Sequence, residues 1–574
     1  MRSTFFGLDM ALRALQTQQQ AIDITNHNVA NANTEGFSRQ TAQLGTTEPY
    51  TVPAFNRNPG PGQVGTGVQV ELVKRVRDLY LDAQIRQEQQ ALGRWEATSN
   101  ALQQIEVIFN EPSDSGLNTL MGRFWAAWQD LTSNPEDVAV RSNLVEQANN
   151  LAVMLRRDYD QLVALRHDMD QQIRIKAADV NGIAQQLADL NAQIAAVQLT
   201  GDQANDLKDK RDLLLDRLSK ISKISYNEAG NGAVNVFLEG MPLVEGNRAN
   251  TLRVAEGADG FARITWSSNG LAVAFGGGEI QGLLEVRDAG IPQRLEQLQQ
   301  LASTLITQVN GIHRGGFGLD GSTSEIIAGL KLVTAGGTST NVAISAIDVS
   351  GATEKTVYTF SSAGASQLTL SATINGVART QTVSVSDMLG AGSTQVLDFS
   401  DLGVKLTLVG GGTDASAANI VDSLTKPATD ELTTGFDFFT GTGANDIAVH
   451  PAVLANPNVV AAASVPCAPG DGSNALAIAQ LQHRSDEASV TGIYKAMIAQ
   501  LGVDGEGAQT MVTNEDLLVQ HLERRKETVS GISLDEETAN LIRYQHAYQA
   551  AARVMTAIDE MLNTIINGMG IVGR

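Results

Sequence analysis

Each end of the chain carries an amphipathic helical stretch whose apolar stripe has no partner within its own segment. Near the C-terminus, apolar residues recur at alternating steps of three and four, which is the spacing of a coiled-coil seam. The seam positions there are Leu541, Tyr544, Tyr548, Ala551, Met555, Ile558, Leu562 and Ile565. Near the N-terminus they are Leu8, Leu12, Leu15, Ile22 and Val29, with the polar residues Gln19 and Asn26 at two further positions. Polar seam residues help to fix register and partner, so the pattern favours a subunit that assembles with others, although it also fits two helices buried in one globular core.

The N-terminal helix is followed by a segment rich in Asn and then by Gly36, residue types that are common where the backbone leaves helical geometry. This segment resembles the N-terminal signature of the flagellar axial proteins, the family of rod, hook and hook-associated proteins. Phe37 stands where Tyr is usual in that family, a difference of one hydroxyl group. The residues that carry the resemblance are Asn31, Asn33, Thr34, Gly36, Phe37, Ser38, Arg39 and Gln40.

The C-terminal helix is preceded by a second signature, in which Asp535, Glu536 and Glu537 lead into Ala539-Asn540-Leu541. This run resembles the hook-associated members of the family. The physical interpretation of the same residues is independent of any family. Ser533 and Glu536 have the spacing of a capping box, and the three acidic residues favour the positive end of the helix dipole.

The resemblance is dense near both termini and thin between them, where it includes Gly65-Thr66-Gly67-Val68, Arg75, Asp78, Asn310 and His313. It implies a structural subunit of the bacterial flagellum that forms the junction between hook and filament and is required for filament assembly, with no reaction and no cofactor. It further implies self-association in a ring, contacts with the hook protein and with a neighbouring hook-associated protein on the filament side, and a cytoplasmic export chaperone that binds the C-terminal helix. A hook or rod protein is the alternative within the family. A secreted protein with an adhesive β insertion is the alternative outside it.

The charge and composition of the chain agree with an exported building block. A net charge of −22 over 574 residues argues against nucleic acid and against anionic membrane surfaces as partners. The sequence has no apolar run of about 18 residues that could span a bilayer. Asp9 and Arg13 interrupt what would be the apolar part of a cleaved signal peptide. With Cys467 alone, an intramolecular disulfide cannot form, and the resemblance implies export through the flagellar type III channel to the outside of the cell.

Between the termini, periodicity predicts an α+β, multidomain fold with terminal coiled-coil-forming helices, a helical-bundle domain and inserted β-rich domains. Helical spacing dominates residues 76–109, and a longer helix is expected from Val138 to about Val197 after an apparent capping box at Ser133 to Glu136. The expected parts are a terminal helical assembly domain (1–40 and 535–574), a helical core domain (41–220 and 473–534), a β meander (221–290), a connecting helix (291–319), an inserted β domain (320–435) and a return segment (436–472).

Alternation with a period of two predicts the strands of both β regions. The meander is expected to end with a strand over residues 271–275. In the insertion, Asn375-Gly376 between two alternating runs is a strong hairpin signal. An adhesive function of the insertion would need an aromatic platform or clustered carboxylates. The insertion offers Tyr358, Phe360 and Phe399 but no cluster of acidic residues.

The sequence contains no convincing catalytic, cofactor-binding or metal-ligating residues. The glycine patterns at 60–65 and 316–321 match a nucleotide-binding loop in letters only, because neither follows a strand and opens a helix. The histidines lack the paired spacing of a metal site. We therefore expect the terminal stripes and the two signatures to be the functional residues.

Overall fold

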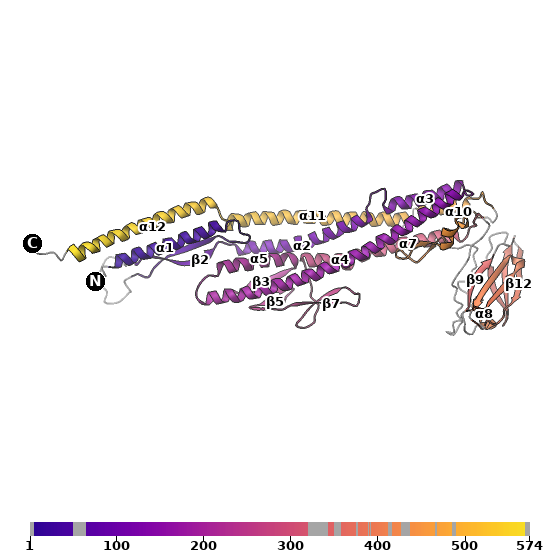
Figure 1. Ribbon diagram of the computed structural model, residues 1–574, viewed down its shortest axis with the longest axis horizontal. Helices are drawn as coiled ribbons and strands as arrows, with labels where there is room; N and C mark the ends of the chain where they lie inside the picture. Colours follow the sequence, from indigo (N-terminus) through magenta and orange to yellow (C-terminus); the bar gives the residue numbers. More distant parts are fainter. Residues whose placement is uncertain are drawn as a thin grey trace, which may run out of the picture. The chain divides into compact units, whose positions relative to one another are not determined.

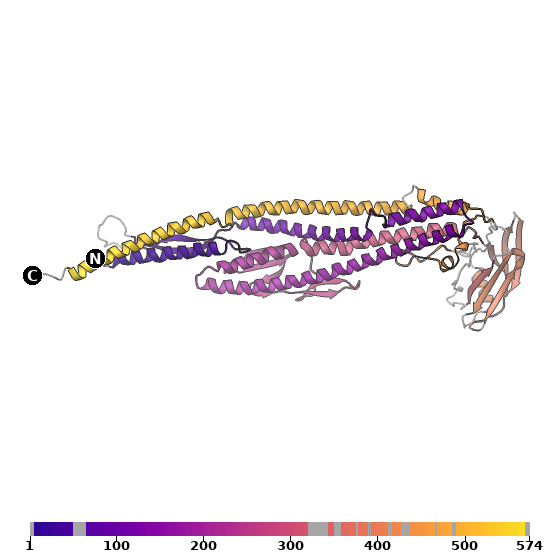
Figure 2. The same ribbon diagram turned by 45° about the horizontal axis from the view of Figure 1, so that its top comes forward.

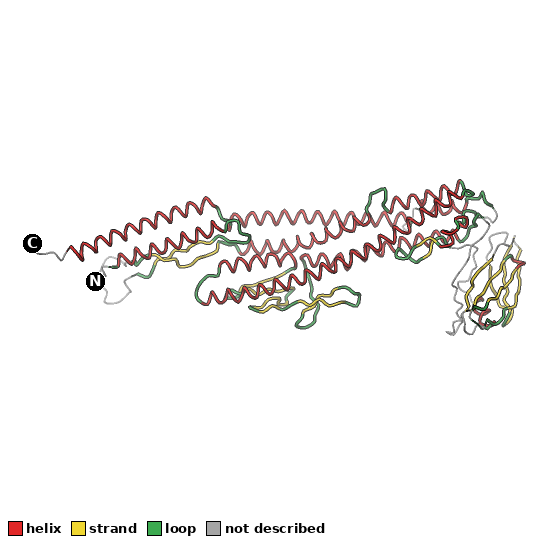
Figure 3. Tube along the Cα trace, viewed as in Figure 1, coloured by secondary structure: helices red, strands yellow, loops and turns green. Residues whose placement is uncertain are grey.

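The computed structural model describes residues 5–49, 65–319, 342–348, 358–374, 377–388, 390, 392–410, 416–425, 437–464, 468–484 and 489–568. The chain forms two compact units. The first unit comprises Met1–Ala101, His167–Arg287 and Gly505–Arg574, and the second comprises Leu102–Arg166 and Asp288–Asp504. Helices dominate both units, and the strands form small separate sheets (Figure 3).

The two termini of the chain pair within the first unit. Helix α1 (Phe6–Ala30) lies along α12 (Leu534–Asn563) and also contacts the hairpin of β1 (Gln40–Thr46) and β2 (Val68–Arg75) (Figure 1). The antiparallel register runs from Gln40 opposite Arg75 to Thr46 opposite Val68. The sequence does not predict this hairpin, because no short turn joins its two strands. Residues 50–64 of the connection lie outside the described residues.

Helices α2 (Leu79–Phe109), α5 (Asn205–Ile221) and α11 (Val490–Ser530) surround the buried part of the first unit. Asp78 caps α2 by accepting a hydrogen bond from the backbone N–H of Tyr80 at 3.0 Å. Gly93 of α2 faces α5 so closely that an added Cβ would lie 2.3 Å from the carbonyl oxygen of Lys220. A larger residue there would push the two helices apart.

Helix α4 (Val138–Leu199) runs beside the strands of the meander (Figure 2). Polar side chains of α4 attach these strands to the helix. Asn191 donates to the carbonyl of Val234 at 2.8 Å and accepts from its N–H at 2.9 Å. Asn181 makes the same pair of bonds to Leu252, at 2.8 and 2.7 Å. Asp170 accepts from the N–H of Ala262 at 2.7 Å. Three side chains of one helix thus bind the backbones of three strands or strand ends.

The meander consists of two sheets, β3-β4-β5-β6 and β7-β8. Its strands are β3 (Ile224–Glu228), β4 (Val234–Leu238), β5 (Met241–Glu245), β6 (Arg248–Ala249), β7 (Leu252–Glu256) and β8 (Ala262–Trp266). The prediction of a strand over residues 271–275 is wrong. In this stretch Ala272 forms an isolated β-bridge with Thr265, and no strand is present. The Gly residues at 276–278 end the segment before a strand can continue, and α6 (Gly278–Glu285) follows.

The second unit is organised around aromatic side chains. Trp128 of α3 (Leu117–Ser133) packs on Phe438, and Phe438 packs edge-on against Phe439 and His313, with ring centroids 4.9 to 5.3 Å apart. His313 and Asn310 belong to α7 (Ile291–His313). The amide of Asn310 donates to the carbonyl of Phe439 at 2.8 Å, and a ring nitrogen of His313 accepts from the N–H of Ala461 at 3.0 Å. Both residues therefore fix the segment that follows the β insertion.

The remaining elements of the second unit are short. They are β15 (Phe439–Thr440), β16 (Ala448–Val449), α9 (Pro451–Ala455), α10 (Ser473–Ala479) and single helical turns at Pro457–Val459 and Gln480–His483. Two π-helical turns, Val286–Gly290 and Thr564–Gly568, extend α6 and α12. Among the described residues, no helix combines the length and the apolarity needed to cross a membrane.

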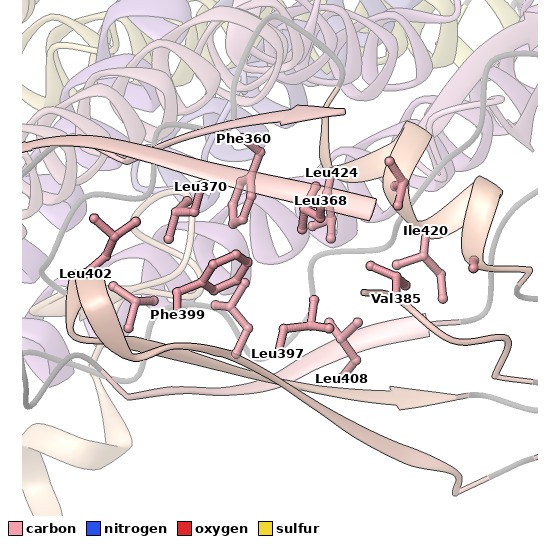
Figure 4. Close-up of a cluster of buried hydrophobic side chains, with 14 of the residues drawn as sticks. Phe360, Leu368, Leu370, Val385, Leu397, Phe399, Leu402, Leu408, Ile420 and Leu424 are labelled. Carbon is pink, nitrogen blue, oxygen red and sulfur yellow. The ribbon is translucent and has the colours of Figure 1, made fainter. Parts of the chain in front are cut away.

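The described part of the β insertion has a hydrophobic core of its own (Figure 4). Its strands form two sheets, β10-β11-β12 and β13-β14-β9, and α8 (Ala417–Leu424) packs against them. The strands are β9 (Val342–Asp348), β10 (Tyr358–Gly364), β11 (Gln367–Ile374), β12 (Val377–Ser384), β13 (Thr394–Phe399) and β14 (Val404–Gly410), with a helical turn at Ser400–Leu402. Ile374 pairs with Val377, which confirms the hairpin predicted around Asn375-Gly376, two residues that themselves lie outside the described part.

The aromatic platform considered for adhesion is not present at the residues that can be checked. Phe360 and Phe399 point into the core of the insertion and are buried, with ring centroids 6.3 Å apart (Figure 4). The side chain of Tyr358 lies outside the described part. Both Phe residues therefore lie on the apolar face of their strands, where they stabilise the pair of sheets.

The predicted α+β fold with paired terminal helices is confirmed. The expected start of α4 at Val138 is correct, but its cap is not the predicted Ser133, which is the last residue of α3. Asp137 provides the cap, because its carboxylate accepts from the N–H of Ala139 at 2.7 Å. The capping box at Ser533 is confirmed in part, since its side chain accepts from the N–H of Glu536.

Candidate assembly interface

An amide three residues before the N-terminal signature joins three segments of the first unit. Asn28, near the end of α1, donates to the carbonyl of Gln40 at 2.8 Å and accepts from the N–H of Gln40 at 2.9 Å. Its amide also donates to a carboxylate oxygen of Glu537 at 3.0 Å. The end of α1, the start of β1 and the start of α12 are therefore fixed to one another.

A buried ion pair completes this junction. Arg39 contacts Glu537 through Nε at 2.8 Å and Glu536 through Nη1 at 2.9 Å. The side chain of Glu537 is 3% exposed, whereas that of Glu536 is 63% exposed. A buried carboxylate is tolerated only when it is paired and hydrogen-bonded, and Glu537 has both kinds of partner. The two signatures, far apart in sequence, thus recognise each other.

The turn between α1 and β1 explains other signature residues. The side chain of Asn31 donates to the carbonyl of His27 at 3.0 Å and accepts from the hydroxyl of Thr34 at 3.2 Å, which closes the helix end. Gly36 has a φ of +77°, a conformation that favours glycine, and an added Cβ would lie 3.2 Å from Cβ of Leu213. Asn33 is exposed.

The rest of the signature faces α5. The half-buried ring of Phe37 packs edge-on against His27 with centroids 5.3 Å apart. The N–H of Ser38 donates to Asp209 at 3.0 Å, and the amide of Gln40 donates to Asp206 at 2.7 Å. Acidic residues of α5 therefore hold the chain as it leaves the turn.

A buried charge cluster lies beside this turn, between α2, α5 and the end of β2. Arg75 contacts Asp209 at 2.7 Å and Asp212 at 2.9 Å, and Arg77 contacts Asp212 at 3.2 Å and Asp82 at 2.5 Å. Burial alone would raise the pKa of Asp212, but Arg77, Arg211, Arg75 and Arg86 together hold that pKa at about 2. Burial opposes the charge of Arg77 as well, and the attraction of Asp212, with Asp82, raises the pKa of that guanidinium.

Sequence reasoning missed this cluster. Its members are charged residues on helices and at a strand end, and such residues usually lie in solvent. The signal that could have revealed it is the spacing of Asp209, Asp212 and Asp216, which places the three acids on one face of a helix.

The predicted N-terminal seam is only partly covered. Leu8, Leu15 and Ile22 are half-buried, while Leu12 is 44% and Val29 40% exposed. The face of α1 that is fully buried is instead small and polar, and consists of Ala11, Thr17, Ala21, Thr25 and Asn28. The hydroxyl of Thr17 donates to the carbonyl of Val68 at 3.0 Å, so this face lies on the hairpin.

The predicted C-terminal seam lies mainly toward α1. Leu562 is buried, and Leu541, Tyr544, Ala551, Met555 and Ile558 are half-buried. Ile558 lies against Gly7 of α1, where an added Cβ would be 3.1 Å from Cδ1 of Ile558. Tyr548 and Ile565 are exposed, together with Val554 and Met561 beside the seam. The paired helices therefore keep apolar surface that the described residues do not cover.

The junction of the two signatures gives a direct test. Changing Glu537→Gln removes the charge that Arg39 contacts while keeping the shape of the side chain. We expect the first unit to lose about 1.5–3 kcal/mol of unfolding free energy, the usual contribution of a hydrogen bond to a charged group. Amide exchange in the signature turn and the first turns of α12 should accelerate. The control is Asp535→Asn in the same turn at an exposed position, and equal exchange in both variants would contradict the role of the ion pair.

The chemistry of this surface is that of protein contact. Among the described residues, no group of three or more His, Cys, Asp or Glu side chains could hold a metal ion. The surface consists of a fixed polar junction at one end of a helix pair and exposed aliphatic side chains along it. Such an arrangement positions two helices for packing against further helices.

Both termini match families of flagellar rod proteins. Residues 8–37 match the family described as "Flagella basal body rod protein", and residues 528–568 match "Flagellar basal body rod FlgEFG protein C-terminal". These matches cover α1 with its signature turn and α12 with the residues before it. The fold and the paired termini thus define a structural protein of the flagellar axis. Between them, residues 102–327 match "Flagellar hook-associated protein FlgK helical domain".

Full-length relatives narrow the class. The chain is 30% identical over 592 residues to flagellar hook-associated protein 1 of Bacillus subtilis (strain 168), covering 100% of both chains. It is 25% identical to the proteins of the same name from Salmonella typhimurium and Escherichia coli (strain K12), with 98% of this chain and 99% of each relative covered. The chain belongs to the flagellar hook-associated protein 1 family, which is structural and not enzymatic. A solved structure, the flagellar hook junction protein FlgK from Burkholderia pseudomallei, aligns with a TM-score of 0.48 at 17% identity over 78% of this chain and 100% of that one.

Proposed function

We propose that this chain is a structural subunit of the junction between flagellar hook and filament, located outside the cell and required for filament assembly. The observation that carries the proposal is the pair of terminal helices, which the two signatures lock together while apolar side chains stay exposed along both helices. In the assembled structure, neighbouring subunits would cover these side chains.

Assembly is driven by burial of that exposed surface. Fully burying a large aliphatic side chain contributes about 1.5–3 kcal/mol, and Leu12, Val29, Val554, Met561 and Ile565 are all available. In our proposal, copies of the chain form a ring in which the terminal helices line the export channel. One rim of the ring contacts the hook protein, and the other contacts a neighbouring hook-associated protein on the filament side.

The same surface needs a cover before export, because an exposed apolar stripe favours aggregation. We infer that a cytoplasmic chaperone binds the C-terminal helix around Leu541 to Ile565 and leaves when the chain enters the type III export channel. On this proposal, the seam of the C-terminal helix is covered first by the chaperone and then by neighbouring subunits.

The other parts of the chain have separate roles in the proposal. The terminal assembly domain (1–40 and 535–574) forms the contacts between subunits, and the helical core domain (41–220 and 473–534) supports it. The connecting helix (291–319) and the return segment (436–472) lead to the inserted β domain (320–435) and back. The meander (221–290) and the insertion take no part in the contacts that build the ring.

Electron microscopy of cells that lack the gene tests the function directly. We expect complete hooks without filaments, and restored filaments when the wild-type gene is returned. Loss of the hook together with the filament would instead indicate a hook or rod protein. Normal filaments in the deleted strain would overturn the proposal.

A further inference from the structure

An acidic side chain in the second unit is buried without a hydrogen-bond partner among the described residues. Asp158 of α4 is 0% exposed, and neither oxygen of its carboxyl group has a hydrogen-bond partner among the described residues. Other buried carboxylates of this chain, such as Glu537 and Asp212, contact arginines directly. The surroundings of Asp158 therefore suit a neutral carboxylic acid.

The charged and titratable groups around Asp158 reinforce this conclusion. Glu111, in the connection between α2 and α3, accepts hydrogen bonds from the hydroxyl of Tyr494 and from the N–H of Asn118, both at 2.8 Å. Tyr494 of α11 is itself buried, and burial together with Glu111 and Asp158 raises its pKa, so it stays a neutral donor. The remaining charge is Arg157 on the same helix, whose side chain is exposed.

These groups act on Asp158 in a definite order. Burial is the largest influence and raises the pKa of Asp158, Arg157 lowers it, and Glu111 raises it further, to about 7. The ordinary value for Asp in an unfolded chain is 3.8. Between these two values the folded chain holds a proton at Asp158 that the unfolded chain does not hold.

We propose that folding of the second unit is coupled to the uptake of one proton by Asp158. The stabilising effect of this proton is complete below the unfolded pKa and is lost as the pH rises from about 4 to about 7. The folded second unit is then more stable in a mildly acidic medium than in an alkaline one. The inference concerns the fold alone and does not depend on the proposed function.

Urea unfolding of the full-length chain tests the coupling. Trp125 and Trp128 are buried in the same unit, and once Trp95 and Trp266 of the first unit are replaced by Phe, their fluorescence reports the transition of the second unit. In Asp158→Asn the amide mimics the protonated acid. We expect the variant and the wild type to have similar urea midpoints at about pH 4, and the variant to have the higher midpoint at about pH 8, where the wild type has lost its proton. Asp160→Asn, two residues away and exposed, should follow the wild type at both pH values.

A second variant keeps the proposal testable if Asp158→Asn folds poorly. Glu111→Gln removes the neighbouring negative charge but keeps an oxygen that can accept from Tyr494, so the pH range in which stability is lost should shift downward. An infrared difference spectrum should also show a protonated carboxyl band near neutral pH in the wild type that is lost in Asp158→Asn. Two results would refute the proton coupling. One is a difference in urea midpoint between Asp158→Asn and the wild type that is the same at both pH values. The other is a dependence of the urea midpoint on pH that is unchanged in Glu111→Gln.

Discussion

Cells that carry Ile558→Asp are expected to secrete the protein into the medium and to show bare hooks with few or no filaments. Ile558 is half-buried against α1 at Gly7, at a position where the helix pair meets further helices in our proposal. A carboxylate placed there loses its hydration without gaining a partner, and such a charge costs several kcal/mol even after relaxation. Met555→Asp, one turn earlier in the seam, should give the same phenotype.

The effect should be confined to the paired terminal helices and the assembly that depends on them. Ile558 belongs to the first unit, and the aromatic cluster and the β insertion belong to the second, so calorimetric melting of the second unit should stay unchanged. Ala557→Asp adds the same charge at the neighbouring exposed position and should leave filaments intact. Normal swimming by cells with either seam variant would show that this stripe does not face a partner.

Of the substitutions proposed for the first unit, Asp212→Asn should lower its free energy of unfolding the most. The change leaves Arg75, Arg77, Arg86 and Arg211 without the carboxylate that they share, and breaking a buried charge network by removing one partner typically costs about 3–5 kcal/mol. Urea unfolding followed by circular dichroism should show that the first unit of the variant unfolds at a lower urea concentration than that of the wild type. Asp179→Asn, exposed on α4, is the matched control and should unfold as the wild type does.

The same carboxylate gives a pH dependence of known sign. Because the pKa of Asp212 is lowered from 3.8 to about 2, its contribution is present above pH 4 and is lost as the pH falls toward 2. The shift corresponds to about 2 kcal/mol at 1.36 kcal/mol per pKa unit. The wild type should lose this amount on acidification, and Asp212→Asn should not. Parallel acid profiles for the two proteins would contradict the assignment.

The helices were predictable because their apolar residues repeat with helical spacing over many turns. Val138 was correctly placed at the start of α4, and the register around Asn375-Gly376 followed from a turn that few other residue pairs can form. The prediction of the α4 cap failed because more than one residue near the helix start could provide it. Ser133 and Asp137 could both cap α4, and the residue closer to the first helical N–H groups does so.

The buried face of α1 could not be predicted from apolar periodicity. That face is built from small and hydroxyl-bearing residues, which let a β hairpin approach the helix, and Thr17 bonds to the hairpin backbone. The charge cluster around Asp212 could not be predicted for a related reason, since a buried charged residue can be recognised in a sequence only when its partners are known. Those partners come from β2, α2 and α5, segments that only the fold brings together.

The attachment of the meander to α4 has a consequence for how this chain can change. Asp170, Asn181 and Asn191 stand about three helical turns apart and accept hydrogen bonds from backbone N–H groups, which every amino acid except proline carries. The strands they hold are therefore free to exchange their outward side chains without losing their anchorage. A fixed helix with an interchangeable sheet allows the exposed side chains of the meander to change during evolution while its attachment to α4 is kept.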